Sequence, residues 1–239
     1  MKILVSGSSG FIGFHLVKSL ISAGHTVVGI DDNNNYYDPK LKLYRLSLLD
    51  SEKFYFYESD INNISIPEQS FDLAINLAAQ AGVRVSKEKE YLYHHSNIKG
   101  FISFCNFCMM KNIDKIIYAS SSSVYGDIND GKFCETSSLK PKSIYGQSKF
   151  TNEMHASKLV NLYDLSMIGL RFFSVFGPYG RPDMAYYAFT KAIKEKETIF
   201  LNNNGNMYRD MTFIDDIIQG IFGAIDYVST AKNKNKNEI

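Results

Sequence analysis

Tyr145 and Lys149 stand in the pattern Y-x-x-x-K, and on a helix this spacing places both side chains on the same face. A phenol has an ordinary pKa of ~10, so it acts as a base near neutral pH only when nearby positive charge favours the phenolate. Lys149 and an oxidised nicotinamide ring are two such charges. A shift of about three pKa units corresponds to roughly 4 kcal/mol, which two charges in a dry site can supply. The pair therefore predicts a base that takes the proton of an alcohol while hydride leaves the same carbon.

Two other pairs have the same spacing, Tyr36 with Lys40 and Tyr187 with Lys191. The first lies in a predicted loop that contains Pro39, and the second follows the sixth predicted strand. Neither pair is therefore expected near a nicotinamide. Tyr145 begins the helix after the fifth predicted strand, and ligands bind at the carboxyl edge of such sheets. That strand ends in the serine-rich segment 120–123, from which a hydroxyl group can complete a hydrogen-bond relay to a substrate oxygen.

Three glycines, Gly7, Gly10 and Gly13, follow directly on the apolar run KILV and precede an apolar helix. Glycines at such a turn let the backbone approach a pyrophosphate, and the helix N-terminus offers free N–H groups and the positive end of its dipole. We therefore expect these glycines, together with Phe11 and Ile12 between the last two, to contact a dinucleotide.

The second predicted strand ends in Asp31, 18 positions after Gly13. A carboxylate here can accept hydrogen bonds from a ribose diol, and it disfavours a 2′-phosphate, so the sequence favours NAD over NADP. Asp60 and Ile61 follow the third predicted strand. They can flank the adenine, but an acidic residue at a strand end is also a common turn former, and the sequence leaves both interpretations open.

Strand-like and helical segments alternate through most of the chain, which predicts an α/β fold with a doubly wound parallel sheet. The expected strands are 2–5, 25–30, 54–57, 72–77, 115–119 and 166–170. The expected helices are 11–23, 41–49, 91–111 and 144–163. After Arg171 the pattern becomes irregular and indicates a smaller lobe, and the polar end AKNKNKNEI is expected to be disordered.

The composition excludes several classes of protein. With 26 basic and 25 acidic residues, the formal net charge is +1, and no overall field favours nucleic acid or an anionic membrane. The apolar run at the N-terminus is too short for a signal peptide or a membrane span, so we expect a cytoplasmic protein. Cys105 and Cys108 lie in an apolar helical stretch and are expected to pack in the core. His94 and His95 have no third ligand beside them, so no metal site is expected.

Several further segments extend this pattern: LAAQAGVR at 77–84, NIKG at 97–100, LRFFSVFGP at 170–178, GRPDMA at 180–185 and RDMTFIDD at 209–216. Together with the glycines and the Y-x-x-x-K pair, they resemble the extended short-chain dehydrogenase/reductases of the NAD-dependent epimerase/dehydratase family, and most of all the bacterial UDP-glucuronate 4-epimerases. The resemblance covers the chain through about Tyr227. It implies a Rossmann-like NAD-binding domain over 1–170, a partial substrate lobe over 171–229 that returns to that domain, and a polar tail over 230–239.

The resemblance also assigns roles to individual residues. It implies that Ser121, Tyr145 and Lys149 are catalytic, with Lys149 as the partner of the base, and that Tyr145 and Lys149 also contact the cofactor. Further cofactor contacts are implied at Leu77, Ala78, Ala79 and Asn97. Substrate contacts are implied at Arg84, Ser122, Ser123, Ser174 and Arg181, with Arg181 as the candidate anchor of a uronate carboxylate.

The residues after Ser121 discriminate between related reactions. Dehydratases of this superfamily carry Asp-Glu after the catalytic hydroxyl, and uronate decarboxylases carry a glutamate at the second position, whereas this chain has Ser122 and Ser123. The sequence therefore favours 4-epimerisation of UDP-glucuronate to UDP-galacturonate. A UDP-galactose type 4-epimerase remains an alternative. An NAD-binding remnant with little activity is another, because the proteins that this chain resembles continue for roughly another hundred residues. The resemblance also implies a homodimer.

Overall fold

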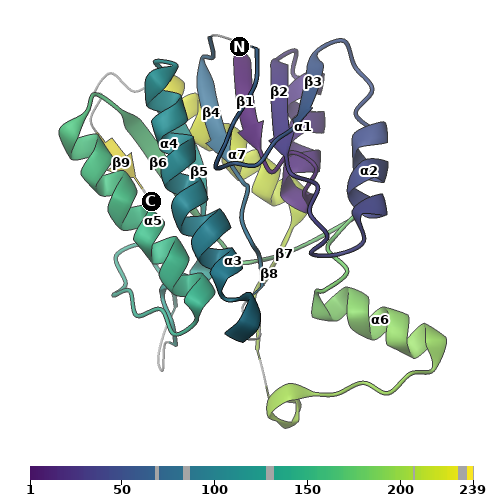
Figure 1. The fold of residues 1–239 in the computed structure, drawn as a ribbon. Helices are drawn as coiled ribbons and strands as arrows, with labels where there is room; N and C mark the ends of the chain where they lie inside the picture. The colour runs from purple at the N-terminus through teal and green to yellow at the C-terminus, as the bar shows by residue number, and fades with distance from the viewer. Residues whose placement is uncertain (68–69, 83–86, 128–131, 207, 231–235, 239) are drawn as a thin grey trace.

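The protein is described here by a computed structural model that covers residues 1–67, 70–82, 87–127, 132–206, 208–230 and 236–238. Its centre is a parallel sheet with the strand order β3-β2-β1-β4-β5-β6-β9, shown in Figure 1. The strands are β1 (Lys2–Ser6), β2 (Thr26–Asp31), β3 (Phe54–Glu58), β4 (Leu73–Asn76), β5 (Lys115–Ser121), β6 (Ser166–Phe172) and β9 (Lys236–Glu238). The order reverses between β1 and β4. The carboxyl ends of these two strands therefore form the crevice in which doubly wound sheets bind ligands.

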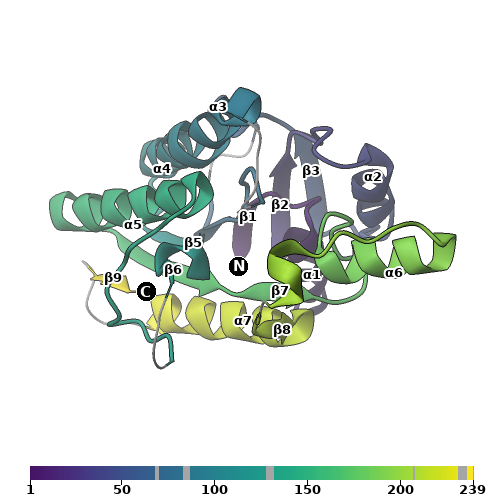
Figure 2. The ribbon, with the colours of Figure 1, turned by 90° about the horizontal axis from the view of Figure 1, so that it is seen from below.

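Helices cover both faces of the sheet, as Figure 2 shows. The first face carries α1 (Phe11–Ser22) and α7 (Ile214–Thr230), and the other carries α4 (Gly100–Met110) and α5 (Ile144–Leu162). A further helix, α2 (Pro39–Ser47), follows β2 and begins with Asp38 as its N-cap, whose side chain accepts from the Lys40 amide. Short helices complete this part: η1 (Lys87–Lys89), α3 (Tyr91–Tyr93), the π-helix η2 (His94–Lys99) and η3 (Ser122–Val124).

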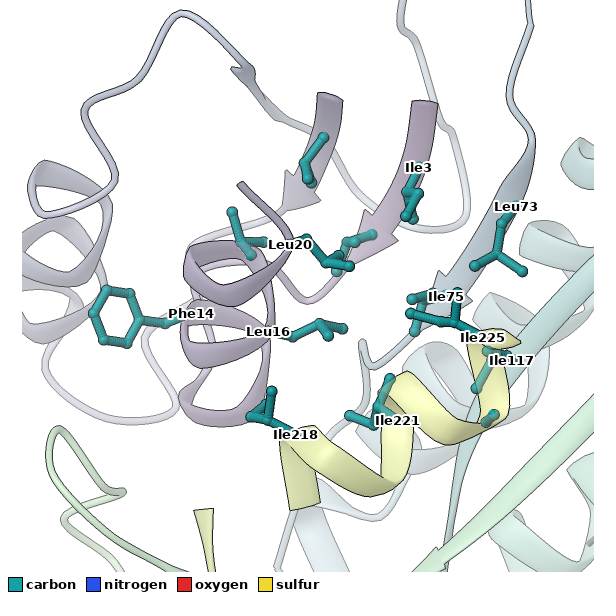
Figure 3. Packing of buried hydrophobic residues seen from close by; sticks show 14 of the residues in the cluster. Ile3, Phe14, Leu16, Leu20, Leu73, Ile75, Ile117, Ile218, Ile221 and Ile225 are labelled. Carbon is teal, nitrogen blue, oxygen red and sulfur yellow. The ribbon is translucent and has the colours of Figure 1, made fainter. Parts of the chain in front are cut away.

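The sheet is apolar on both sides because each face is covered, and its buried strands read as near-continuous hydrophobic runs. On the α1 and α7 side, Leu16, Leu20, Ile221 and Ile225 belong to one buried cluster with Ile75 of β4, as Figure 3 shows. All five side chains are at most 1% exposed, and each fully buried aliphatic side chain contributes about 2 kcal/mol. The opposite face is filled by a second cluster from α4, α5 and the sheet. It includes Cys105 and Cys108, which are free and buried, in agreement with their predicted packing role.

A smaller substructure lies at the carboxyl ends of the strands. It contains the two-stranded sheet of β7 (Ser174–Phe176) and β8 (Met211–Phe213), with α6 (Ala185–Glu195) and η4 (Asn202–Gly205) between them (Figure 1). Because α7 starts at Ile214, directly after β8, the chain then returns to the main sheet. No side chain of α6 is fully buried.

The predicted α/β fold is confirmed, and each of the six expected strands is present. The expected continuous helix 91–111 is instead divided into α3, η2 and α4, with a π-helical stretch at His94–Lys99. The tail also differs from the prediction, because residues 236–238 pair with Ser166–Ile168 as β9. A polar segment with little strand propensity gave no signal for this pairing, which depends on the open edge that β6 offers.

Candidate active site

The glycine-rich turn lies where the sequence predicts it, at the carboxyl end of β1. Gly7 has a φ of +72°, and a Cβ atom there would lie 2.7 Å from the amide nitrogen of Ala78. A Cβ atom on Gly13 would lie 2.0 Å from the carbonyl oxygen of Gly7. Gly10 caps α1 without any side chain, so the amides of the first turn are not covered by a capping group. Only glycine fits this close approach, and a helix N-terminus without a side-chain cap is suited to a pyrophosphate.

Asp31 lies at the end of β2 and is 8% exposed. Its carboxylate accepts from the amides of Ser9 at 3.2 Å and Asn33 at 3.0 Å, and from the Lys42 ammonium at 3.4 Å. A carboxylate has about four acceptor positions, so acceptor capacity remains for a ribose hydroxyl. Asp31 therefore fits the role that the sequence assigns to it.

Lys42 was not singled out from the sequence. It is 5% exposed and lies between Asp31 and the side chain of Asn34, whose Oδ1 atom is 3.3 Å from its Nζ atom. A lysine in a predicted helix ordinarily indicates a solvated surface. The only available signal was its position on the helix that follows the Asp31 strand.

The loop after β4 packs on the glycine-rich turn. Leu77 and Ala78 lie against Gly7, and Ala79 follows them in the chain, while contact of the three with the cofactor stays a prediction. Asn97, from η2, is 1% exposed and holds this loop by accepting from the Gln80 amide at 2.7 Å and donating to the Gln80 carbonyl at 3.1 Å. It also donates to the Ser148 hydroxyl at 2.9 Å. Asn97 thus positions the loop, and a direct contact with the cofactor stays a prediction.

Asp60 and Ile61 follow β3 and have different environments. Asp60 forms an ion pair with His95 at 3.0 Å. Burial opposes ionisation of Asp60, but hydrogen bonds from Asn62 and His95 hold its pKa below the usual value. Ile61 is buried at 7% exposure in the second core cluster. Their contact with adenine stays a prediction.

Ser121, Tyr145 and Lys149 come together at the carboxyl end of β5. The side chain of Ser143 caps α5 by accepting from the Gly146 amide at 3.0 Å, which places Tyr145 in the first turn of this helix. The Ser121 side chain interacts with the Tyr145 hydroxyl and acts to lower its pKa. The Nζ atom of Lys149 lies 5.9 Å from the centre of the Tyr145 ring and donates to the Ala119 carbonyl at 2.8 Å. The predicted triad is therefore assembled.

The pKa values in the triad follow from burial. Burial raises the pKa of Tyr145, and the charge of Arg181 and the hydrogen bond with Ser121 oppose this rise. Burial lowers the pKa of Lys149 to about 8. The sequence predicts that Lys149 and a nicotinamide lower the pKa of the phenol. In the structure, the cation that lowers the pKa of Tyr145 is Arg181. Tyr93, which contacts the Tyr145 ring edge-on at 6.2 Å, lines the same place.

Arg181 is the predicted carboxylate anchor, and its side chain is 22% exposed. Its guanidinium binds both oxygens of Asp183, with Nε at 3.0 Å and Nη2 at 2.5 Å. Tyr36 donates to the same carboxylate at 3.0 Å. From the sequence, Tyr36 is not expected near a nicotinamide, and this stays a prediction. In the structure its hydroxyl reaches Asp183, beside Arg181.

The remaining predicted substrate contacts lie at the carboxyl edge. Ser122 and Ser123 form η3 directly after Ser121, and the Ser123 amide donates to the Ser121 hydroxyl at 3.2 Å. Ser174 begins β7 and is half-buried. Arg84 lies outside the described residues.

A buried ion pair that the sequence did not indicate supports the serine segment. Glu153, one turn after Lys149 on α5, binds Arg171 of β6 through two hydrogen bonds of 2.9 and 2.8 Å. It also accepts from the Ser120 hydroxyl at 2.5 Å. Arg171 in turn donates to Tyr125 at 3.1 Å. Since the four side chains connect α5, β5 and β6, they fix the backbone from which Ser121 projects.

Two kinds of feature were not found among the residues that the structure describes. They contain no cluster of three or more histidine, cysteine or acidic side chains that could hold a metal ion. Within the same residues, no helix is both long and apolar enough to cross a membrane.

Comparisons with known proteins identify the family of this chain. Residues 3–238 match the NAD-dependent epimerase/dehydratase family. The chain belongs to this family. The protein CapI of Staphylococcus aureus is 45% identical over 228 residues, which are 92% of this chain and 68% of CapI. UDP-glucuronate 4-epimerase 4 of Arabidopsis thaliana is 42% identical over 236 residues, 95% of this chain and 54% of that protein.

The fold is also that of an epimerase of this family. The structure of UDP-glucuronic acid 4-epimerase from Bacillus cereus in complex with UDP-glucuronic acid and NAD has a TM-score of 0.89 and 33% identity, covering all of this chain and 76% of that one. The family is NAD-dependent, and the glycine-rich turn, Asp31 and the triad of this chain fit the cofactor. Because the chain spans about half of the Arabidopsis relative and about two thirds of CapI, further parts of these proteins have no counterpart in it.

Proposed function

We propose that this chain carries the active site of an NAD-dependent 4-epimerase that interconverts UDP-glucuronate and UDP-galacturonate through a transient ketone at sugar C4. The position of Arg181 carries the proposal, because its charge acts directly on the candidate base Tyr145. In a glucuronate, the carboxylate is attached to C5, one carbon from the reacting C4 hydroxyl. A sugar whose C4 hydroxyl reaches Tyr145 therefore has its carboxylate within reach of a cation at this place.

The proton is handled by the residues of the triad. NAD, when bound, supplies the chemistry of accepting hydride from the sugar carbon and returning it. Tyr145 takes the C4 hydroxyl proton, and Ser121, whose side chain interacts with the Tyr145 hydroxyl, relays or orients that proton. Lys149 is held in place by the Ala119 carbonyl and stabilises the phenolate with its charge. Tyr145 returns the proton after the ketone has exposed its opposite face.

The carboxylate must be held during this rotation. A uronate with a ketone at C4 is a β-keto acid, which readily loses carbon dioxide. Arg181 is the proposed anchor, and Ser122, Ser123 and Ser174 add hydroxyl donors from the same edge of the sheet. Ser122 and Ser123 stand where related dehydratases and decarboxylases carry acidic residues, and a serine cannot replace a carboxylate in acid or base catalysis. Retention of the carboxylate is therefore the expected outcome.

The test is incubation of the purified protein with NAD and UDP-glucuronate, with separation of the products by chromatography. We expect UDP-galacturonate from the wild type and none from Tyr145→Phe. Faster turnover of UDP-glucose than of UDP-glucuronate would instead indicate a UDP-galactose type epimerase. Release of carbon dioxide with a UDP-pentose would indicate decarboxylation, and a folded protein that binds NAD without any product would indicate a remnant.

A further inference from the structure

Arg181 does not project freely from its loop. Asp183 binds it side-on, through Nε and Nη2, and the Tyr36 hydroxyl donates to the Asp183 oxygen that accepts from Nη2. The ring of Tyr36 also lies beneath the guanidinium, with the central carbon of the guanidinium 5.7 Å from the ring centre. The hydroxyl of Tyr36 packs on the backbone of Gly82, where a Cβ atom would lie only 2.6 Å away. Arg181, Asp183 and Tyr36 thus form a connected unit, which we call the arginine clamp.

The backbone before Arg181 is held by a second arginine. Arg45 of α2 is fully buried, and its Nε and Nη2 atoms donate to the Tyr179 carbonyl at 3.1 and 2.7 Å. Its Nη1 atom donates to the Ser9 carbonyl at 3.1 Å and to the Tyr37 hydroxyl at 2.6 Å. Arg45 therefore connects the glycine-rich turn to the segment that ends in Gly180 and Arg181. A buried arginine bound by carbonyl and hydroxyl acceptors keeps its full charge and holds these acceptors firmly.

The two residues that hold the Arg181 segment from outside its lobe, Tyr36 and Arg45, come from the same stretch of chain. Tyr36 and Arg45 follow Asp31, the residue expected at the ribose of the cofactor, and neither belongs to the lobe that carries Arg181. Side-on binding by Asp183 occupies Nε and one position of Nη2. Among the described residues, Nη1 of Arg181 has no hydrogen bond to another group. The remaining N–H groups of Nη1 and Nη2 can donate two parallel hydrogen bonds to a second carboxylate.

We infer that Asp183 and Tyr36 are positioning residues, which hold the guanidinium of Arg181 with its Nη1 end presented to the substrate carboxylate. Arg45 fixes the backbone from which Arg181 projects. The inference rests on the proposed function in one respect, the identity of the carboxylate. The clamp itself is a property of this chain and can be measured without substrate.

The test compares Asp183→Asn and Tyr36→Phe with two matched controls on the surface. Asp127→Asn removes a carboxylate from an exposed ion pair with Lys142, and Tyr187→Phe removes a hydroxyl from a tyrosine of α6 that is 46% exposed. The first readout is the arginine Nε–H resonance of Arg181 in the full chain, assigned by its loss in Arg181→Lys. We expect this resonance to shift and exchange faster in both clamp variants and to stay unchanged in both controls. An unchanged resonance in both clamp variants overturns the inference.

The second readout is turnover with NAD on UDP-glucuronate and on UDP-glucose. Asp183→Asn should raise KM for UDP-glucuronate on the order of tenfold and Tyr36→Phe about threefold, with little change for UDP-glucose. A lower KM in Asp183→Asn would mean that Asp183 competes with the substrate for Arg181, which overturns the positioning role. If the wild type neither binds nor converts UDP-glucuronate, the proposed function fails, and a shifted Arg181 resonance in the clamp variants still supports the clamp.

Discussion

The Nζ atom of Lys149 donates to the carbonyl oxygen of Ala119 at 2.8 Å, while the Lys149 side chain is buried to 3% exposure. The lysine thus lies between the end of β5 and the ring of Tyr145. Its burial there disfavours the charged form of its own side chain. Burial lowers its pKa to about 8. The burial that places Lys149 beside the candidate base therefore also affects the stability of the fold.

The charge of Lys149 should make stability depend on pH. Its folded pKa of about 8 is below the ordinary 10.5, so between these values the unfolded chain binds more protons. The free energy of unfolding must then rise with pH in this window, by up to about 3 kcal/mol, whereas below pH 8 the burial cost is fully present. Lys149→Met lacks this titration. We expect the wild type to gain stability relative to Lys149→Met between pH 8 and 10.5 in urea unfolding, and parallel curves would contradict the assignment.

Replacement of the phenol should separate catalysis from binding. Tyr145→Phe keeps the ring that packs against Tyr93 and removes only the hydroxyl that interacts with Ser121, so we expect the fold and the glycine-rich turn to be unaffected. We expect turnover of UDP-glucuronate to fall at least on the order of 10²-fold, since general base catalysis contributes about that much or more. The affinity for NAD, measured by quenching of tyrosine fluorescence, should change less than about threefold. Retained turnover would show that another group is the base.

The sequence predicted the parts of the site that local pattern determines. The glycine spacing, Asp31 and the Tyr145–Lys149 pair each depend on a strand-to-helix turn or on one helical face, and the structure places all of them as expected. Tyr36 and Arg45 were missed because their partners are distant in the chain. Tyr36 and Asp183 are 147 positions apart, and Arg45 and Tyr179 are 134 apart. No local periodicity carries such pairings, and a buried arginine in a short helix has the same sequence signature as an exposed one.

Removing one partner of the ion pair between Glu153 and Arg171 should destabilise the fold more than removing both, because the net contribution of the pair is small. Their side chains are only 3% and 8% exposed, and Glu153→Ala would leave the Arg171 guanidinium buried without its carboxylate. We expect a loss of about 3–5 kcal/mol in the free energy of unfolding. The double variant Glu153→Leu with Arg171→Met removes both charges and should be clearly more stable than Glu153→Ala. Asp127→Ala, in an exposed ion pair, is the control and should cost less than about 1 kcal/mol.

Gly13 and Gly223 should differ clearly in their tolerance of an added Cβ atom. A Cβ atom at this position would lie 2.0 Å from the Gly7 carbonyl oxygen, which is backbone and cannot rotate away, so α1 must move from the end of β1. Gly13→Ala should therefore destabilise the fold by roughly 2 kcal/mol or more and weaken NAD binding at least tenfold. Gly223→Ala is the matched control, because a Cβ atom there meets nothing within 4 Å on the exposed face of α7. That variant should gain about 0.5–1 kcal/mol from helix propensity and bind NAD as the wild type does. Thermal unfolding with and without NAD distinguishes the two, and equal behaviour of both variants would exclude a close approach of α1 to the β1 turn.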